Sequence, residues 1–158
     1  MKKFFLRLGE LICVALLVVF IVFVSTRDKV STTPFKEVSK SVTASCNLEG
    51  LIERDGLDLK RQLSLEAGDY KGFVYYSSDS VMDVRELIVL SSDNKELLSQ
   101  AKEKITVYIE EKAGLFEGYA PEESELINSH VLTEKKGFLL FYVGEGKEKV
   151  LSAFSEAL

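Results

Sequence analysis

The chain opens with a long apolar segment, after which apolar and charged positions alternate. Residues 11–24 carry no charge. A helix over residues 11–26 would rise about 24 Å at about 1.5 Å per residue, which is less than a hydrocarbon core of about 30 Å. We therefore expect the helix to begin near Phe4, so that residues 1–26 form an N-terminal transmembrane helix.

A cleaved secretory signal peptide is the alternative, because such peptides also combine a basic start with an apolar stretch. Their cleavage sites need small residues, whereas cleavage after Ser25 would place Phe23 at the upstream specificity position. We therefore favour an uncleaved signal-anchor. Because Lys2, Lys3 and Arg7 lie on the short N-terminal side, that end is expected to stay in the cytoplasm. The sequence thus predicts a single-pass protein of the cell membrane with an extracellular C-terminal domain.

Beyond a polar tether over residues 27–33, the periodicity of apolar residues predicts helices and strands. Thr33 followed by Pro34 is typical of a helix start, with a hydroxyl at the N-cap and proline at the first helical position. Asp93 with Glu96 forms a capping-box pattern at the start of the longest helix. The expected helices cover residues 34–43, 57–63, 93–114, 121–128 and 147–158, and the expected strands cover residues 72–77, 84–91, 131–133 and 138–143.

Apart from the short helix at 121–128, the order of these elements is two short helices, then two strands, a helix, two strands and a helix. It predicts an α+β fold in which a mostly antiparallel four-stranded sheet has the two longer helices on one face. The strand at 138–143 is apolar at every position, and residues 87–90 behave likewise, so both faces of the sheet need cover. The helices at 34–43 and 57–63 are the expected cover for the second face. A partner, or a second copy of the chain, is the alternative.

Composition indicates one acidic domain over residues 34–158. The first 26 residues contain three of the 20 Lys and Arg and one of the 25 Asp and Glu, so the rest of the chain has a net charge of −7. Its length suits one hydrophobic core. Nucleic acid and anionic headgroups require clustered cations, so we expect no nucleic-acid partner. Cys46 is the one cysteine outside the leader, which contains Cys13, and we expect Cys46 to be buried and inert.

Residue patterns that carry chemistry are weak in this chain. His130 is the only histidine, and no set of further ligands at metal-binding spacing accompanies it. The acidic cluster at Glu122, Glu123 and Glu125, near Glu117, is typical of the first turn of a helix, where the helix dipole favours carboxylates. The glycine-rich stretch before the last helix lacks the spacing of a phosphate-binding loop. We therefore expect no catalytic residue, no cofactor and no metal site.

Four short stretches carry a family resemblance. They are residues 69–75 (DYKGFVY), 83–87 (DVREL), 116–122 (FEGYAPE) and 137–140 (GFLL). In this order they resemble domain of unknown function family 4358, which consists of short exported or membrane-anchored proteins of clostridial-type Gram-positive bacteria. The resemblance implies a location and a fold over about residues 34–158, and no reaction is assigned to the family.

The Gly-Tyr-x-Pro stretch within this resemblance suggests an interaction surface. Tyr119 and Pro121 form a rigid, amphipathic corner, because proline fixes its own φ and pushes the preceding residue toward extended geometry. Tyr70 marks the entry to a strand in a similar way. With Glu117 and Gly118, these residues form the candidate interaction surface. The alternative is that the tyrosines are packing corners whose hydroxyls tie down loops.

The leading hypothesis is a noncatalytic binding or interaction module at the cell envelope, held at the membrane by its N-terminal helix. It would bind an envelope protein, another envelope component or a second copy of itself through its loops or its second sheet face. A small envelope hydrolase that uses acidic residues such as Glu86 and Glu117 is one alternative, and it predicts a deep pocket holding a carboxylate with a raised pKa. A structural subunit of a membrane complex is the other.

Overall fold

The computed structural model describes residues 14–18 and 30–158 and has a mixed α+β fold. Residues 14–18 are helical. Most of the expected membrane helix, and residues 27–29 of the expected tether, lie outside the described residues. Within the described ranges, no helix is both long and apolar enough to cross a bilayer.

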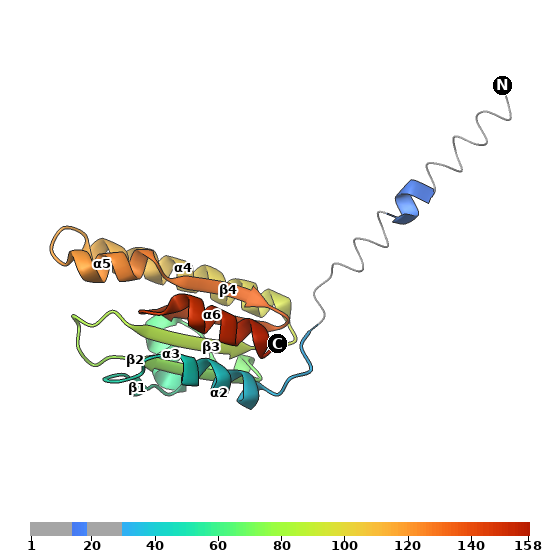
Figure 1. The fold of residues 1–158 in the computed structure, drawn as a ribbon, viewed down its shortest axis with the longest axis horizontal. Helices are drawn as coiled ribbons and strands as arrows, with labels where there is room; N and C mark the ends of the chain where they lie inside the picture. Colours follow the sequence, from blue (N-terminus) through green and yellow to red (C-terminus); the bar gives the residue numbers. More distant parts are fainter. Residues whose placement is uncertain (1–13, 19–29) are drawn as a thin grey trace, which may run out of the picture.

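A five-stranded antiparallel sheet forms the centre of the fold (Figure 1). The strands lie in the order β1-β2-β3-β5-β4, and every neighbouring pair is antiparallel. The prediction of four strands is wrong because β1 has only two residues, which is too short to show an alternating pattern. The strands are β1 Ile52–Glu53, β2 Gly72–Ser77, β3 Glu86–Ser91, β4 Val131–Lys135 and β5 Phe138–Val143.

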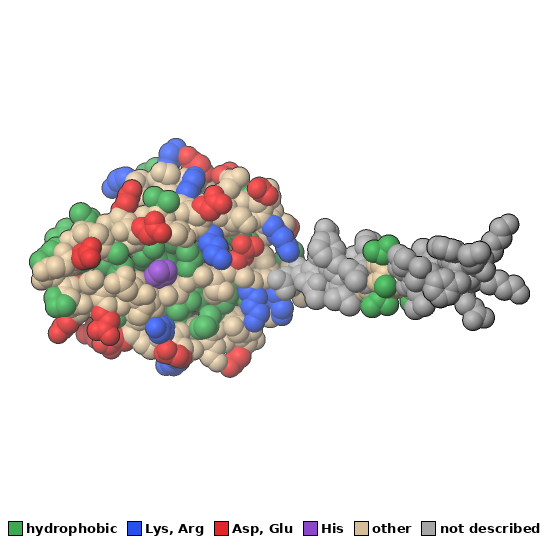
Figure 2. Space-filling view, turned by 90° about the horizontal axis from the view of Figure 1, so that it is seen from above, with side chains coloured by type: hydrophobic (Ala, Val, Ile, Leu, Met, Phe, Trp, Pro, Cys, Tyr) green, Lys and Arg blue, Asp and Glu red, His purple; other side chains and the backbone are tan. Residues whose placement is uncertain are grey.

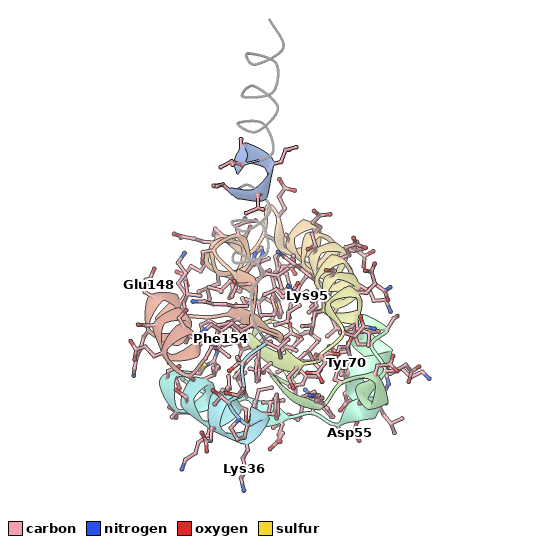
Figure 3. All side chains as sticks on the ribbon, turned by 90° about the vertical axis from the view of Figure 1, so that its right-hand side faces the viewer. Lys36, Asp55, Tyr70, Lys95, Glu148 and Phe154 are labelled. Carbon is pink, nitrogen blue, oxygen red and sulfur yellow. The ribbon has the colours of Figure 1, made fainter. Side chains whose placement is uncertain are left out.

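Helices cover both faces of the sheet, as the end-on view in Figure 3 shows. One face is covered by α2 Phe35–Ser45 and α6 Lys147–Glu156, and the other by α3 Gly56–Leu63, α4 Lys95–Phe116 and α5 Pro121–Asn128. A 3-10 turn, Ala67–Asp69, precedes β2. The prediction that the two longer helices share a face is wrong, since α4 and α6 lie on opposite faces. The first two helices, α2 and α3, were expected to cover one face together, but they lie on opposite faces. α2 packs with α6, whereas α3 packs with α4.

The central strands are buried on both sides, as their composition predicts. Every residue of β3 and β5 is buried. Ile88 and Phe141 belong to the core under α3 and α4, whereas Leu87 and Leu140 belong to the core under α2 and α6. Burial of one such side chain contributes about 1.5–3 kcal/mol, so both helical layers stabilise the sheet. The second sheet face is therefore closed by this chain's own helices.

Two helix starts differ from the sequence prediction by one residue. Asn94, not Asp93, is the N-cap of α4, and its Oδ1 accepts a hydrogen bond from the Glu96 N–H at 3.0 Å. Glu96 is then the second helical residue, so the predicted capping box is absent. At α2, Pro34 is the N-cap without a side-chain cap, and the N–H of Thr33 donates to Ser31 Oγ instead.

The sheet has two distinct ends (Figure 1). At the entry end, residues 30–34 meet the β4–β5 turn, where the Ser31 N–H donates to the Lys136 carbonyl at 2.7 Å. At the loop end, residues 78–85 join β2 to β3 beside the C-terminal end of α4. α4 runs from the first end to the second.

Candidate functional site

A fully buried carboxylate, Glu86, lies at the start of β3. Its Oε1 accepts a hydrogen bond from the Tyr75 hydroxyl at 2.7 Å, and its Oε2 accepts from the Tyr108 hydroxyl at 3.0 Å. The Lys112 ammonium donates to Oε2 at 2.9 Å and neutralises the charge. A buried charge of this kind is tolerated only when it is paired and hydrogen-bonded, as it is here.

The same environment suppresses ionisation of the two tyrosines. Burial, and then the negative charge of Glu86, raise the pKa of Tyr75 and of Tyr108 well above the ordinary value. Tyr75 also lies 2.6 Å from Gln62 Oε1, so its hydroxyl joins the network to α3. The network therefore ties β2, β3, α3 and α4 together with neutral tyrosines and one ion pair.

A cleft of about 530 Å³ opens beside this network at the loop end. It lies between α3, residues 78–85 and the second half of α4, and Tyr108 and Lys112 connect its wall to the buried carboxylate. The charged residues that line the cleft are Arg54, Asp58, Arg61, Asp79, Asp83, Arg85, Glu111 and Lys112.

The three arginines of the cleft are each paired with an acid of the same chain. Their charges are therefore balanced before any ligand arrives, and the cleft suits a neutral or zwitterionic polar group better than a strongly charged one. The pairs are Arg54–Asp79 at 2.8 Å, Arg61–Asp58 at 3.4 Å and Arg85–Asp83 at 2.6 Å.

Two of these arginines hold the β2–β3 loop in place. Arg54 donates to the Ser77 hydroxyl and to the Ser78 carbonyl, both at 2.8 Å. Arg85 donates to Asp83 through its side chain and its backbone N–H, and the side-chain bond holds the pKa of Asp83 below its usual value. A loop restrained at both ends loses less conformational entropy when it binds a ligand.

Exposed apolar side chains form a rim around the cleft. Val81 at the tip of the loop is 87% exposed, and Leu115 near the end of α4 is 70% exposed. Tyr119 is 59% exposed and stacks on Phe116 with ring centroids 5.6 Å apart. Exposed apolar patches mark interaction sites, and tyrosine is enriched at protein interfaces.

A protein-family profile described as Domain of unknown function (DUF4358) matches residues 44–144, which is more than half of the chain. The chain belongs to this DUF4358 family. The resemblance predicted from the four sequence stretches is thereby confirmed. The comparisons with curated proteins and with solved structures found no match.

The DUF4358 match contains the whole cleft, but the predicted surface residues do not form one surface. Glu117 is the C-cap of α4, Gly118 follows it with φ +89°, and Pro121 is the first residue of α5, so these residues lie with Tyr119 at the loop end. Tyr70 precedes β2 at the entry end, visible in Figure 3, beside the ion pair between its neighbour Lys71 and Asp93.

The two carboxylates of the hydrolase alternative are also separate in the DUF4358 domain. Glu86 has no exposed surface, and both of its oxygens are engaged. Glu117 is exposed and is not among the residues that line the cleft. The pair therefore has no shared site in which one carboxylate could act as an acid and the other as a base.

The other candidate residues have structural surroundings. Glu122 and Glu123 lie in the first turn of α5, as predicted. His130 precedes β4, with Nδ1 2.8 Å from the Ile127 carbonyl oxygen. Cys46 is half-buried after α2, and burial raises its pKa to about 11, which keeps it as an unreactive thiol. In the described part of the chain, no three His, Cys, Asp or Glu side chains are grouped to hold a metal ion.

Sequence reasoning missed the residues that surround Glu86, although one signal was available. Glu86 directly precedes the apolar run at residues 87–90, and a carboxylate in a buried strand requires partners. Tyr108 and Lys112 are four residues apart and therefore share a helix face. Which face meets Glu86 depends on the packing of α4 on the sheet, and that information is not local.

Proposed function

We propose that this DUF4358 chain is a noncatalytic, membrane-anchored binding domain of the cell envelope and that it binds its ligand in the cleft. Its apolar leader anchors it, and residues 34–158 lie outside the cell. The ligand is a polar envelope component without a strong net charge, such as a peptide that carries both an ammonium and a carboxylate group.

The cleft supports this proposal most directly. It has a restrained loop, balanced charges and an apolar rim, whereas the one buried carboxylate beside it has no free oxygen for chemistry. Because α2 and α6 close the second sheet face, the loop surface is the better of the two surfaces considered from the sequence. The cleft also lies at the opposite end of the sheet from residue 30, so an N-terminal anchor leaves it accessible (Figure 1).

Cosedimentation of the detergent-solubilised full chain with purified Gram-positive cell-wall sacculi tests the proposal. Arg61→Glu and Leu115→Asp change exposed residues that line the cleft, so both variants should fold. We expect each to weaken binding about tenfold, which corresponds to about 1.4 kcal/mol.

Lys71→Glu is the matched control, because Lys71 is also exposed and also pairs with an acid but lies at the entry end. It should bind as the unchanged chain does. The proposal fails if the unchanged chain stays in the supernatant, or if the cleft variants sediment as well as the control. Release of soluble wall fragments by the unchanged chain would show hydrolysis and refute the noncatalytic assignment.

A further inference from the structure

The outer edge of β4 carries main-chain groups that have no partner among the described residues. Lys136 and Gly137 both have positive φ and form the two-residue turn that joins β4 to β5, so Lys135 and Phe138 are a hydrogen-bonded pair. Because hydrogen bonding alternates along the strand, the N–H and C=O groups of Leu132 and Glu134 point away from β5. Such an edge is a template for a further strand.

This edge lies at the bottom of a groove rather than on a bare surface. α4 and α6 lie over the β4–β5 pair on opposite faces of the sheet. Figure 2 shows the edge from above, with hydrophobic side chains gathered around the single histidine, His130. The residues of β4 are half-buried except Lys135, which is exposed.

α6 places an exposed leucine beside the same edge. The Lys147 ammonium donates to the Ser129 carbonyl just before β4, and the Lys136 ammonium donates to the Leu158 carbonyl just after β4. α6 therefore runs alongside β4, and Leu151, which is 40% exposed, comes level with Leu132. Leu151 therefore adds an apolar surface on the α6 face of this edge, where Val131 packs, whereas Leu132 packs on the opposite face, against the core under α3 and α4.

We infer that two copies of this chain pair through β4, antiparallel and centred on Leu132, to form a continuous sheet. In this register, the two Leu132 residues exchange both of their main-chain hydrogen bonds. Each Glu134 N–H donates to the His130 carbonyl of the second copy. Within one copy, no donor among the described residues bonds to the His130 carbonyl oxygen.

Side-chain complementarity selects this register from its neighbours. Centring on Leu132 places leucine opposite leucine, Val131 opposite Thr133, and Glu134 opposite His130, an acid opposite a base. A register centred on Thr133 would place Glu134 opposite Leu132. A register centred on Glu134 would place two carboxylates opposite each other, which is destabilising.

The helical layers also fit a second copy. Strands lie about 4.8 Å apart, so two α6 helices, each over its own β4–β5 pair, would lie about 10 Å apart, which is a normal packing distance between helices. Their Leu151 side chains would then meet at the two-fold axis. The entry ends of the two copies point in opposite directions along the strands. When the strands lie parallel to the bilayer surface, both tethers can reach the same bilayer. The clefts lie at the loop ends, away from the β4 interface, so both stay open.

Disulfide crosslinking of the full chain in membranes tests the inference. In a background with Cys13→Ser and Cys46→Ser, Leu132→Cys places two cysteines about 5.5 Å apart between Cα atoms, which is within disulfide range. Thr133→Cys is the matched control, because its Cα atoms would be about 8 Å apart. We expect a crosslinked dimer from Leu132→Cys and little from Thr133→Cys.

A solution measurement without introduced cysteines provides the second readout. Glu134→Pro removes only an outward N–H, which an edge strand tolerates, whereas Glu134→Ala keeps that donor. The unchanged chain and the Ala variant should have the mass of a dimer in detergent, after correction for bound detergent, and the Pro variant that of a monomer. A monomeric unchanged chain, preferential crosslinking at Thr133→Cys, or crosslinking of Leu132→Cys to a different protein would overturn the inference.

Discussion

Glu86 shows how a single residue connects the core of this protein to its candidate site. The carboxylate is inaccessible to solvent, yet it reaches the wall of the cleft through Tyr108 and Lys112. Its oxygens accept from two tyrosines and a lysine, which leaves no hydrogen-bonding capacity for catalysis in the folded state. The residue therefore stabilises the end of the sheet that carries the cleft.

Removal of the lysine should be strongly destabilising. Lys112→Met leaves Glu86 buried without a counter-charge, and loss of one partner of a buried pair costs about 3–5 kcal/mol. Lys104→Met changes an exposed lysine about two turns nearer the entry end on the same helix, and it should cost less than about 1 kcal/mol. Urea denaturation of the full chain measures both values, and equal losses would refute the importance of the buried pair.

The buried tyrosines predict how stability changes at alkaline pH. Tyr75 and Tyr108 have a raised pKa in the folded chain, whereas an unfolded tyrosine has a pKa of about 10. Above pH 10 the unfolded chain therefore releases protons that the folded chain keeps. The free energy of unfolding should then fall as pH rises, by up to about 1.4 kcal/mol per pH unit for each tyrosine.

Tyr108→Phe removes one of these titrating groups, so its unfolding free energy should fall less steeply above pH 10. Cys46 also titrates in this range, but it is present in both proteins and does not affect the difference. Denaturation series from pH 8 to about pH 11 compare the two slopes. Equal slopes would contradict the protonated state assigned to Tyr108.

Among the elements, those with a strong local pattern were predictable. The apolar runs at β3 and β5 predicted strands buried on both faces, and Pro121 predicted the start of α5. The two-residue β1 has no such pattern and was missed. The side of the sheet taken by α4 and α6 could not be predicted, because β5 offers an apolar surface on both faces and an amphipathic helix fits either one.

Two neighbouring residues, Asp93 and Asn94, are candidates for the N-cap of α4, and mutation can tell them apart. Asn94→Ala removes the side-chain acceptor for the Glu96 N–H and should cost about 1 kcal/mol of stability. Asp93→Ala removes only an exposed ion pair with Lys71 and should cost less than about 0.5 kcal/mol. Thermal unfolding of the two variants compares them directly. A larger loss for Asp93→Ala would restore the cap predicted from sequence.

At the scale of the whole molecule, the length of α4 explains why the predicted interaction surface divides. This helix has 22 residues and is therefore about 33 Å long. Tyr70 lies near its first turn, and the residues 117–121 follow its last turn. The sequence predicts a turn at Tyr70 and another at residues 117–121. Only the path of α4 across the sheet shows that these two turns lie at opposite ends of the domain.

The arrangement of the whole chain at a membrane is the central claim, because the proposed binding of an envelope component depends on a domain outside the cell. The apolar residues 11–24 and the basic residues before them supply its physical basis. The cleft can meet envelope components only if residues 34–158 are on that side.

Protease added to intact cells that carry the full chain with a C-terminal epitope tests this claim most directly. We expect the epitope to be lost from intact cells while a cytoplasmic marker protein stays whole. An epitope that survives until the cells are lysed would place the domain inside the cell and contradict the account.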